Sequence, residues 1–144
     1  MLCTVLKGAT IIDGQGNPPI HNGVLLFENG TIKAVGSLAD TALPEDARVY
    51  DLSGFYIIPG LIDTHVHMDL HGLADTYEEN RLDDKLRAIR AAKEMENTVR
   101  AGFTTVRNAG SVNYIDVAVR QAIAERLISG PRVLASGKII CMQA

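Results

Sequence analysis

The sequence predicts an α/β fold in which a small β-sandwich domain leads into the beginning of a (β/α)8 TIM-type barrel. Two observations predict it: short β-rich segments with frequent turns fill residues 1–58, and strands alternate with helices over residues 59–144. Such alternation is typical of right-handed βαβ units and a parallel sheet. Because a complete barrel needs about 250 residues, we expect only its first three βα units in this chain, which also ends directly after an apolar segment.

The β-rich part contains one specific hairpin signal. Asn29-Gly30 lies between the apolar segments 24–27 and 32–35, and Asn-Gly accepts the positive φ angles of a type I′ turn. Residues 49–52 and 55–58, separated by Ser53-Gly54, predict a further strand pair. Short strands bounded by turns favour a small sandwich or an open barrel.

After Pro59-Gly60 the pattern predicts strands at 61–67, 103–107 and 132–136, with helices over about 78–100 and 114–128. On the longer helix, helical spacing favours an apolar face toward the core and a charged face toward solvent. The predicted apolar face consists of Leu82, Leu86, Ile89, Ala92 and Val99, and the predicted charged face of Arg81, Asp84, Lys85, Arg87 and Arg90.

Composition excludes several classes of protein. Hydrophobic residues make up 47% and charged residues 22% of the chain, and the net charge is -3, so no basic patch favours nucleic acid. No apolar run approaches the roughly 20 residues that span a bilayer. The N-terminus lacks a signal peptide, and Cys3 and Cys141 form no disulfide framework. We therefore expect a cytoplasmic protein.

Two histidines alternate on the strand that follows Pro59-Gly60. In His65-Val66-His67 the side chains of the histidines point the same way, because side chains alternate faces along a strand. Two imidazoles on one face, at the carboxyl end of a barrel strand, are placed to bind one divalent metal. Asp63, two residues earlier, is a candidate acceptor that holds these ligands in place.

The segment 58–67, Ile-Pro-Gly-Leu-Ile-Asp-Thr-His-Val-His, resembles the signature of the amidohydrolase superfamily. The β-rich part, with Asp13-Gly14 and the Asn29-Gly30 hairpin, resembles that family's N-terminal sandwich half. Segments 101–107 and 129–133 resemble the second and third strand entries of its imidazolonepropionase-like and Xaa-Pro dipeptidase-like branch. The resemblance covers essentially the whole chain.

The resemblance implies a metal-dependent hydrolase in which His65 and His67 bind the more buried of one or two divalent ions, most often zinc. It implies further ligands on later strands: a carboxylated lysine or a glutamate, two histidines, and an aspartate that serves as general base. None of those strands lies in this chain, so we assign no catalytic base to it. Asn108 stands where many relatives carry Asp, with a supporting or loop-turn role, and His71 is a candidate for substrate contact.

Several functions remain open. The favoured one is hydrolysis of amide bonds in dipeptide-like or acyl-amino-acid substrates, with these residues as the N-terminal part of a homo-oligomeric enzyme. The alternatives are a cyclic-amide hydrolase or deaminase of the same superfamily, and a non-catalytic fragment that needs the remainder of the polypeptide. A free-standing metal module is disfavoured, since two histidines leave a four-coordinate zinc site incomplete.

Overall fold

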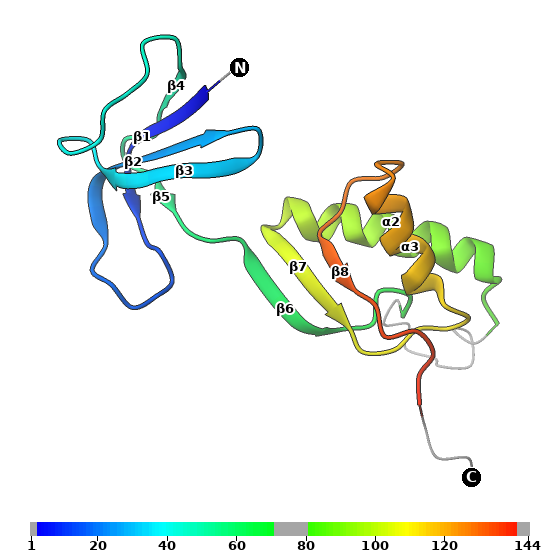
Figure 1. Cartoon of the computed structure of the whole chain (residues 1–144). Helices are drawn as coiled ribbons and strands as arrows, with labels where there is room; N and C mark the ends of the chain where they lie inside the picture. Colours follow the sequence, from blue (N-terminus) through cyan, green and yellow to red (C-terminus); the bar gives the residue numbers. More distant parts are fainter. Residues whose placement is uncertain (1–2, 71–80, 141–144) are drawn as a thin grey trace. The chain divides into compact units, whose positions relative to one another are not determined.

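The computed structural model describes residues 3–70 and 81–140. The chain divides into two compact units, Met1–Pro59 and Gly60–Ala144 (Figure 1). The first unit contains only strands among its described residues, and the second alternates strands with helices. The fold is therefore α/β, with a β-rich unit followed by a βαβ series.

The first unit is a five-stranded sheet with a central β1 (Cys3–Ile11). Strand β2 (Ile20–Glu28) pairs antiparallel with β1 and with β3 (Thr31–Ser37). The turn between β2 and β3 has φ values of 51° at Asn29 and 74° at Gly30, as a type I′ turn requires. The predicted hairpin is thus confirmed. All described strands of this unit belong to this one sheet, so a sandwich stays a prediction.

The strand pair predicted around Ser53-Gly54 is wrong. Strands β4 (Arg48–Asp51) and β5 (Tyr56–Ile57) do not pair with each other but lie one after the other along β1, both parallel to it. The Asp51 carboxylate accepts hydrogen bonds from the Ser53 hydroxyl (2.6 Å) and from the Ser53 backbone N–H (2.9 Å), which hold the pKa of Asp51 below its usual range. This local turn interrupts the strand without reversing it, which explains why the turn signal was misleading.

Gly8 faces that turn with a φ of 87°, and a Cβ built on it would lie 2.5 Å from Ser53 Oγ. We expect Gly8→Ala to lower the free energy of unfolding of this unit by about 2–3 kcal/mol, through left-handed strain and overpacking together. Gly30→Ala is the matched control, because Gly30 has a φ of 74° and no atom lies within 4 Å of the place that an added methyl group would take; it should cost only about 1 kcal/mol. Equal losses in urea denaturation would contradict the packing argument.

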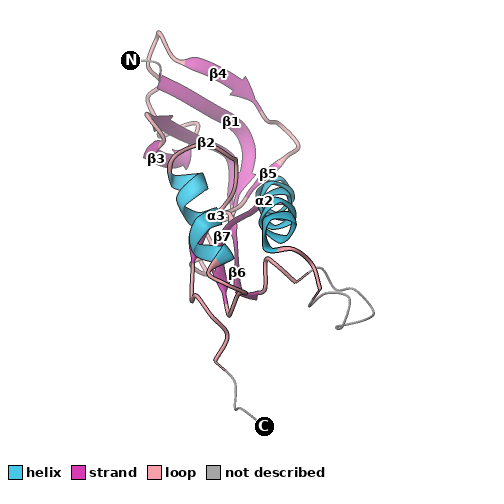
Figure 2. Cartoon of the chain, turned by 90° about the vertical axis from the view of Figure 1, so that its right-hand side faces the viewer, coloured by secondary structure: helices cyan, strands magenta, loops and turns pink. Residues whose placement is uncertain are grey.

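The second unit is a three-stranded parallel sheet in the order β6 (Leu61–Val66), β7 (Phe103–Asn108), β8 (Arg132–Leu134). Helix α2 (Asp84–Arg100) connects β6 to β7, and α3 (Ile115–Ala124) connects β7 to β8. Figure 2 shows both helices, in cyan, against the strands. Seven residues form the buried core between helices and sheet: Met68, Ala91, Met95, Val106, Ile115, Val119 and Val133.

The buried face of α2 differs from the prediction. Leu86 and Ile89 are 42% and 67% exposed, whereas Arg87, assigned to the solvated face, is 2% exposed and shares the buried stripe with Ala91 and Met95. The helix also begins at Asp84, after an Asp83 N-cap whose side chain accepts from the Lys85 backbone N–H. Ala91 belongs to the buried core and Ala88 packs against it, and the pattern of large apolar side chains alone did not indicate that this face is the buried one.

In the parts of the chain that the structure describes, no helix combines the length and the apolar character needed to cross a membrane.

Candidate metal centre

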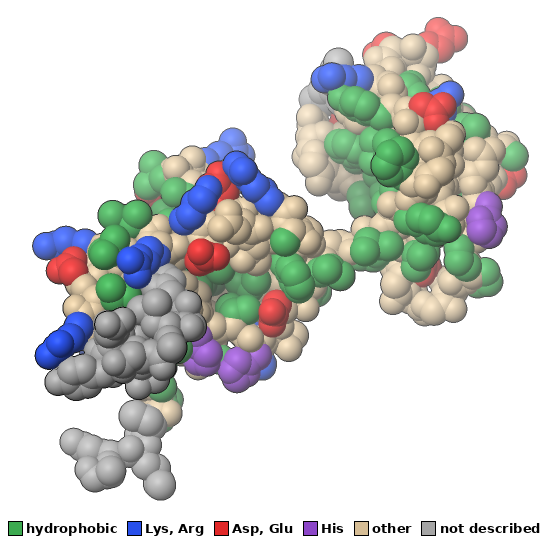
Figure 3. Space-filling view, turned by 180° about the vertical axis from the view of Figure 1, so that it is seen from behind, with side chains coloured by type: hydrophobic (Ala, Val, Ile, Leu, Met, Phe, Trp, Pro, Cys, Tyr) green, Lys and Arg blue, Asp and Glu red, His purple; other side chains and the backbone are tan. Residues whose placement is uncertain are grey.

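His65 and His67 lie together at the carboxyl end of β6. Their ring centroids are 5.3 Å apart, with the rings edge to face at 71°. The side chain of His65 is exposed and that of His67 is half-buried. In Figure 3 the histidine side chains of this unit, in purple, lie beside one another at its surface. The structure thus brings the two predicted ligands together at a position that is open to a metal ion.

The backbone fixes the proton on His67. Its Nδ1 lies 2.9 Å from the carbonyl oxygen of Gly110, in the loop after β7. Because a carbonyl oxygen only accepts hydrogen bonds, Nδ1 must carry the proton in this contact. In the neutral ring the lone pair is then on Nε2, the tautomer in which histidine ligates a metal while its other nitrogen is held by a backbone carbonyl.

Asp63 acts on the backbone of this strand end. Its Oδ1 accepts a hydrogen bond of 3.0 Å from the backbone N–H of His65. The strand register is irregular between Asp63 and Val66, so simple alternation does not describe this segment. Arg107 on β7 contacts the same end of β6, since its Nε donates to the carbonyl oxygen of Thr64 at 2.6 Å. Both side chains therefore shape the peptide units that carry His65.

Asn108 is a buried link between loops. It ends β7, is 1% exposed, and its Oδ1 accepts a hydrogen bond of 3.0 Å from the Met68 backbone N–H. Its Nδ2 donates to Asp116 Oδ2 at 3.2 Å. The predicted loop-turn alternative for Asn108 is therefore wrong, because the residue is paired in the strand. Asn108 thereby holds the backbone of Met68, the residue next to His67.

Asp116 accepts hydrogen bonds from several segments of the second unit, a role that the sequence pattern did not indicate. It is fully buried in the first turn of α3, and its Oδ2 accepts from the backbone N–H groups of Ser136 (3.0 Å) and Gly137 (2.9 Å) as well as from Asn108. Its Oδ1 accepts from the Val117 backbone N–H at 2.9 Å. An acidic residue in the first turn of a helix is ordinary in sequence, so only the tertiary contacts distinguish it.

A second buried carboxylate lies just after the histidine pair. Asp69 is 0% exposed, and its Oδ2 accepts a hydrogen bond of 2.8 Å from the Val112 backbone N–H. Its carbonyl oxygen accepts from Arg87 Nη1 at 3.1 Å. Asp69 and Arg87 thus tie the chain after β6 to α2 and to the loop after β7. Neither was predicted, since the charge pattern placed Arg87 on the solvated face.

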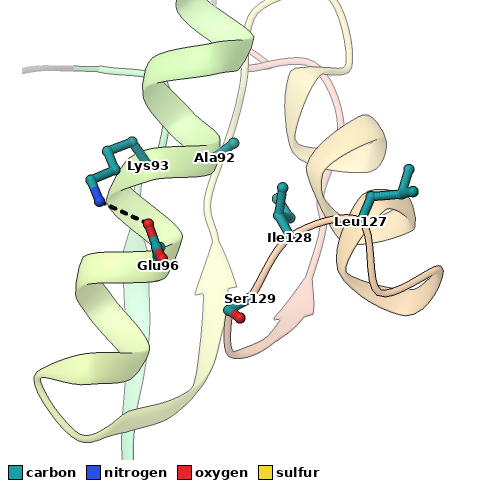
Figure 4. Close-up of a pocket in the computed structure, with 6 residues that line it drawn as sticks. All are labelled: Ala92, Lys93, Glu96, Leu127, Ile128 and Ser129. Carbon is teal, nitrogen blue, oxygen red and sulfur yellow. Dashed lines mark hydrogen bonds and ion pairs between the residues drawn. The ribbon is translucent and has the colours of Figure 1, made fainter.

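Other candidate positions lie away from the pair. His71 falls outside the described residues. A hollow of about 400 Å³ between α2 and the segment after α3 is lined by Ala92, Lys93, Glu96, Leu127, Ile128 and Ser129 (Figure 4). It adjoins the residues that precede β8, at the opposite ends of the parallel strands from His65 and His67. Lys93 and Glu96 form an ion pair of 2.8 Å there, so the two charged side chains of this hollow are paired with each other.

The donor set fits a divalent metal in part. Two adjacent imidazoles, one with its Nε2 lone pair available, are typical zinc ligands. The described residues contain no group of three or more His, Cys, Asp and Glu side chains arranged to hold a metal. A zinc site of ordinary four-coordinate geometry therefore needs donors besides these two.

The fold and the site together define an α/β protein with a histidine pair at the carboxyl end of a parallel strand. The Amidohydrolase family matches residues 56–142, more than half of the chain, and the chain belongs to that family. This confirms the superfamily predicted from the sequence. A dihydroorotase of Geobacter sulfurreducens is 38% identical over 103 residues, which are 71% of this chain and 20% of that protein. An N-acyl-D-aspartate deacylase of Alcaligenes xylosoxydans xylosoxydans is 40% identical over 70 residues, 49% of this chain and 13% of that protein.

Solved structures extend the similarity to both units. A prolidase complexed with N-methylphosphonate-L-proline is 31% identical with a TM-score of 0.79, over 94% of this chain and 32% of that one. A Xaa-Pro dipeptidase with bound methionine in its active site is 25% identical with a TM-score of 0.82, over 96% of this chain and 34% of that one. The chain thus spans about a third of these structures and about a fifth of the dihydroorotase.

Proposed function

We propose that this chain supplies the histidine pair of a metal-dependent amidohydrolase, and that its second unit forms the first three βα units of that enzyme's (β/α)8 barrel. The single observation that carries the proposal is the pairing of His65 and His67, with ring centroids 5.3 Å apart, at the carboxyl end of a parallel strand. Barrel enzymes build their active sites at that end of the strands.

The packing of the second unit supports the barrel. Both helices pack on the face of the sheet that presents Val106 and Val133. Leu61 and Leu134, on the two outer strands, are 43% and 54% exposed. Parallel sheets are normally covered on both faces and extended at their edges. Further βα units, contributed by the remainder of a longer polypeptide, would cover these residues and supply the missing metal donors.

The chain's own residues would hold and orient the metal. A bound divalent ion, zinc in the first instance, supplies Lewis acidity that polarises an amide carbonyl and makes water nucleophilic near neutral pH. His67 offers Nε2 because Gly110 holds Nδ1, and Asp63 and Arg107 fix the backbone around His65. No residue of this chain is proposed as the general base.

The favoured substrates are amide bonds in dipeptide-like or acyl-amino-acid compounds, supported by the similarity to a prolidase and a Xaa-Pro dipeptidase over nearly the whole chain. A cyclic amide is the second candidate. The similarity to a dihydroorotase favours it, because dihydroorotate carries its amide bonds within a ring. The two candidates share the metal site and differ in the pocket that later loops would form.

One assay separates these possibilities. Xaa-Pro dipeptides, N-acyl amino acids and dihydroorotate are supplied to the 144-residue chain alone and to the longest natural polypeptide that contains it, before and after chelation and zinc reloading. We expect hydrolysis of one class by the long polypeptide only, lost on chelation and restored by zinc. Hydrolysis that resists chelation, or no hydrolysis of any of these substrates by either polypeptide, would contradict the proposed metal-dependent activity. A long polypeptide that assembles as a homo-oligomer would agree with the proposed assembly.

A further inference from the structure

We infer that Asp116 is a positioning residue of the histidine pair: its buried carboxylate and its backbone N–H together fix the loop that holds His67 in its metal-ligating tautomer. The inference rests on the proposed function only for the metal itself. It starts from an observation that the proposed function does not use, a fully buried carboxylate that accepts four hydrogen bonds without contacting either histidine.

The connection runs through the loop after β7. Gly110, whose carbonyl oxygen accepts from His67 Nδ1, lies between Asn108 and Ser111. Asp116 contacts both Asn108 and Ser111: its Oδ2 accepts from Asn108 Nδ2 at 3.2 Å, and its backbone N–H donates to Ser111 Oγ at 3.2 Å. The loop is thereby fixed on each side of the carbonyl that determines the tautomer of His67.

Asp116 also fastens the loop to the next strand. Its Oδ2 accepts from the N–H groups of Ser136 and Gly137 beyond β8, and the Gly137 carbonyl accepts from the Ser111 N–H at 2.9 Å. The carboxylate therefore joins the ends of β7 and β8 and the beginning of α3. A carboxylate is suited to this role because each of its groups in these contacts is an acceptor, whereas an amide in its place would present a donor to other donors.

Nuclear magnetic resonance of the 144-residue chain tests the inference directly. The histidines are labelled with ¹⁵N, and the signals of His67 are assigned by their loss in His67→Gln. At alkaline pH the metal-free wild type should show His67 protonated on Nδ1 with a bare Nε2. Asp116→Asn should give a mixture of tautomers at His67, and titration with Zn²⁺ should show an affinity at least about 10-fold weaker, the loss typical of removing a group that orients a ligand.

Two variants separate positioning from stability. Val119→Ala removes buried methyl groups three residues along the same helix, where Val119 is 3% exposed, and should destabilise the unit without changing the tautomer or the Zn²⁺ affinity. Ser111→Ala removes only the acceptor of the Asp116 N–H, and should shift both readouts in the direction of Asp116→Asn by a smaller amount. If Asp116→Asn does not fold, Ser111→Ala decides the matter.

The inference is overturned if Asp116→Asn, or Ser111→Ala in its place, keeps the wild-type tautomer and affinity, or if Val119→Ala loses both equally. Failure of the proposed function looks different. The longest natural polypeptide that contains this chain would then show no Zn²⁺-dependent change at His65 or His67, and the tautomer of the variants would still decide the role of Asp116.

Discussion

His67→Ala is expected to lower the zinc affinity of the longer enzyme by at least about 100-fold. The estimate is a lower limit, because removing a group that merely orients a ligand costs about 10–100-fold, and this change removes the ligand itself. His67 is half-buried and its Nδ1 is held by the Gly110 carbonyl, and the described residues contain no group of three or more His, Cys, Asp and Glu side chains arranged to hold a metal. Zinc content after dialysis, determined by plasma mass spectrometry, is the measurement.

His21→Ala is the matched control for that variant. His21 lies exposed on β2, in the other unit, with its Nδ1 3.4 Å from Thr10 Oγ1. The same chemical change there should leave the zinc content at the wild-type level. Equal zinc loss from both variants would mean adventitious binding, and unchanged zinc in His67→Ala would remove this residue from the site.

Asn108→Asp is expected to destabilise the second unit by about 3–5 kcal/mol, the range for an uncompensated buried charge. Asn108 is 1% exposed, and its Nδ2 lies 3.2 Å from Asp116 Oδ2. A carboxylate at this position would replace a donor with an acceptor and place two negative charges side by side in the interior. Urea denaturation followed by circular dichroism measures the loss.

Asn113→Asp is the control, because it makes the same change at an exposed pair. Asn113 Nδ2 donates to Asp84 Oδ2 at 2.7 Å, and both side chains face solvent. The loss there should stay within about 0.5 kcal/mol, since solvent screens exposed charges. If Asn108→Asp were as mild as Asn113→Asp, the buried network around Asp116 would not have the role assigned to it.

The sequence predicted what depends on local pattern. The Asn29-Gly30 turn and the parallel βαβ series follow from backbone preferences and periodicity, and His65 and His67 are close because only one residue separates them in the sequence. The resemblance of segment 58–67 to a family signature added the prediction that these histidines bind a metal. These features need no knowledge of which distant segments meet.

What the sequence could not predict depends on distant contacts. Strands β4 and β5 both pair with β1, and the turn between them, at Asp51 and Ser53, packs against Gly8 of β1. Arg87 and Asp116 are buried because loops from other strands supply their partners. A charged residue on a helix ordinarily faces solvent, so pattern alone assigns such residues to the surface.

The most direct test of the central claim is anomalous diffraction at the zinc edge from crystals of the protein grown with zinc. We expect a peak about 2.0–2.1 Å from His67 Nε2 and from a ring nitrogen of His65, with the contact between His67 Nδ1 and the Gly110 carbonyl intact. A zinc-loaded crystal with no peak at this pair, or with zinc on His67 Nδ1, would contradict it.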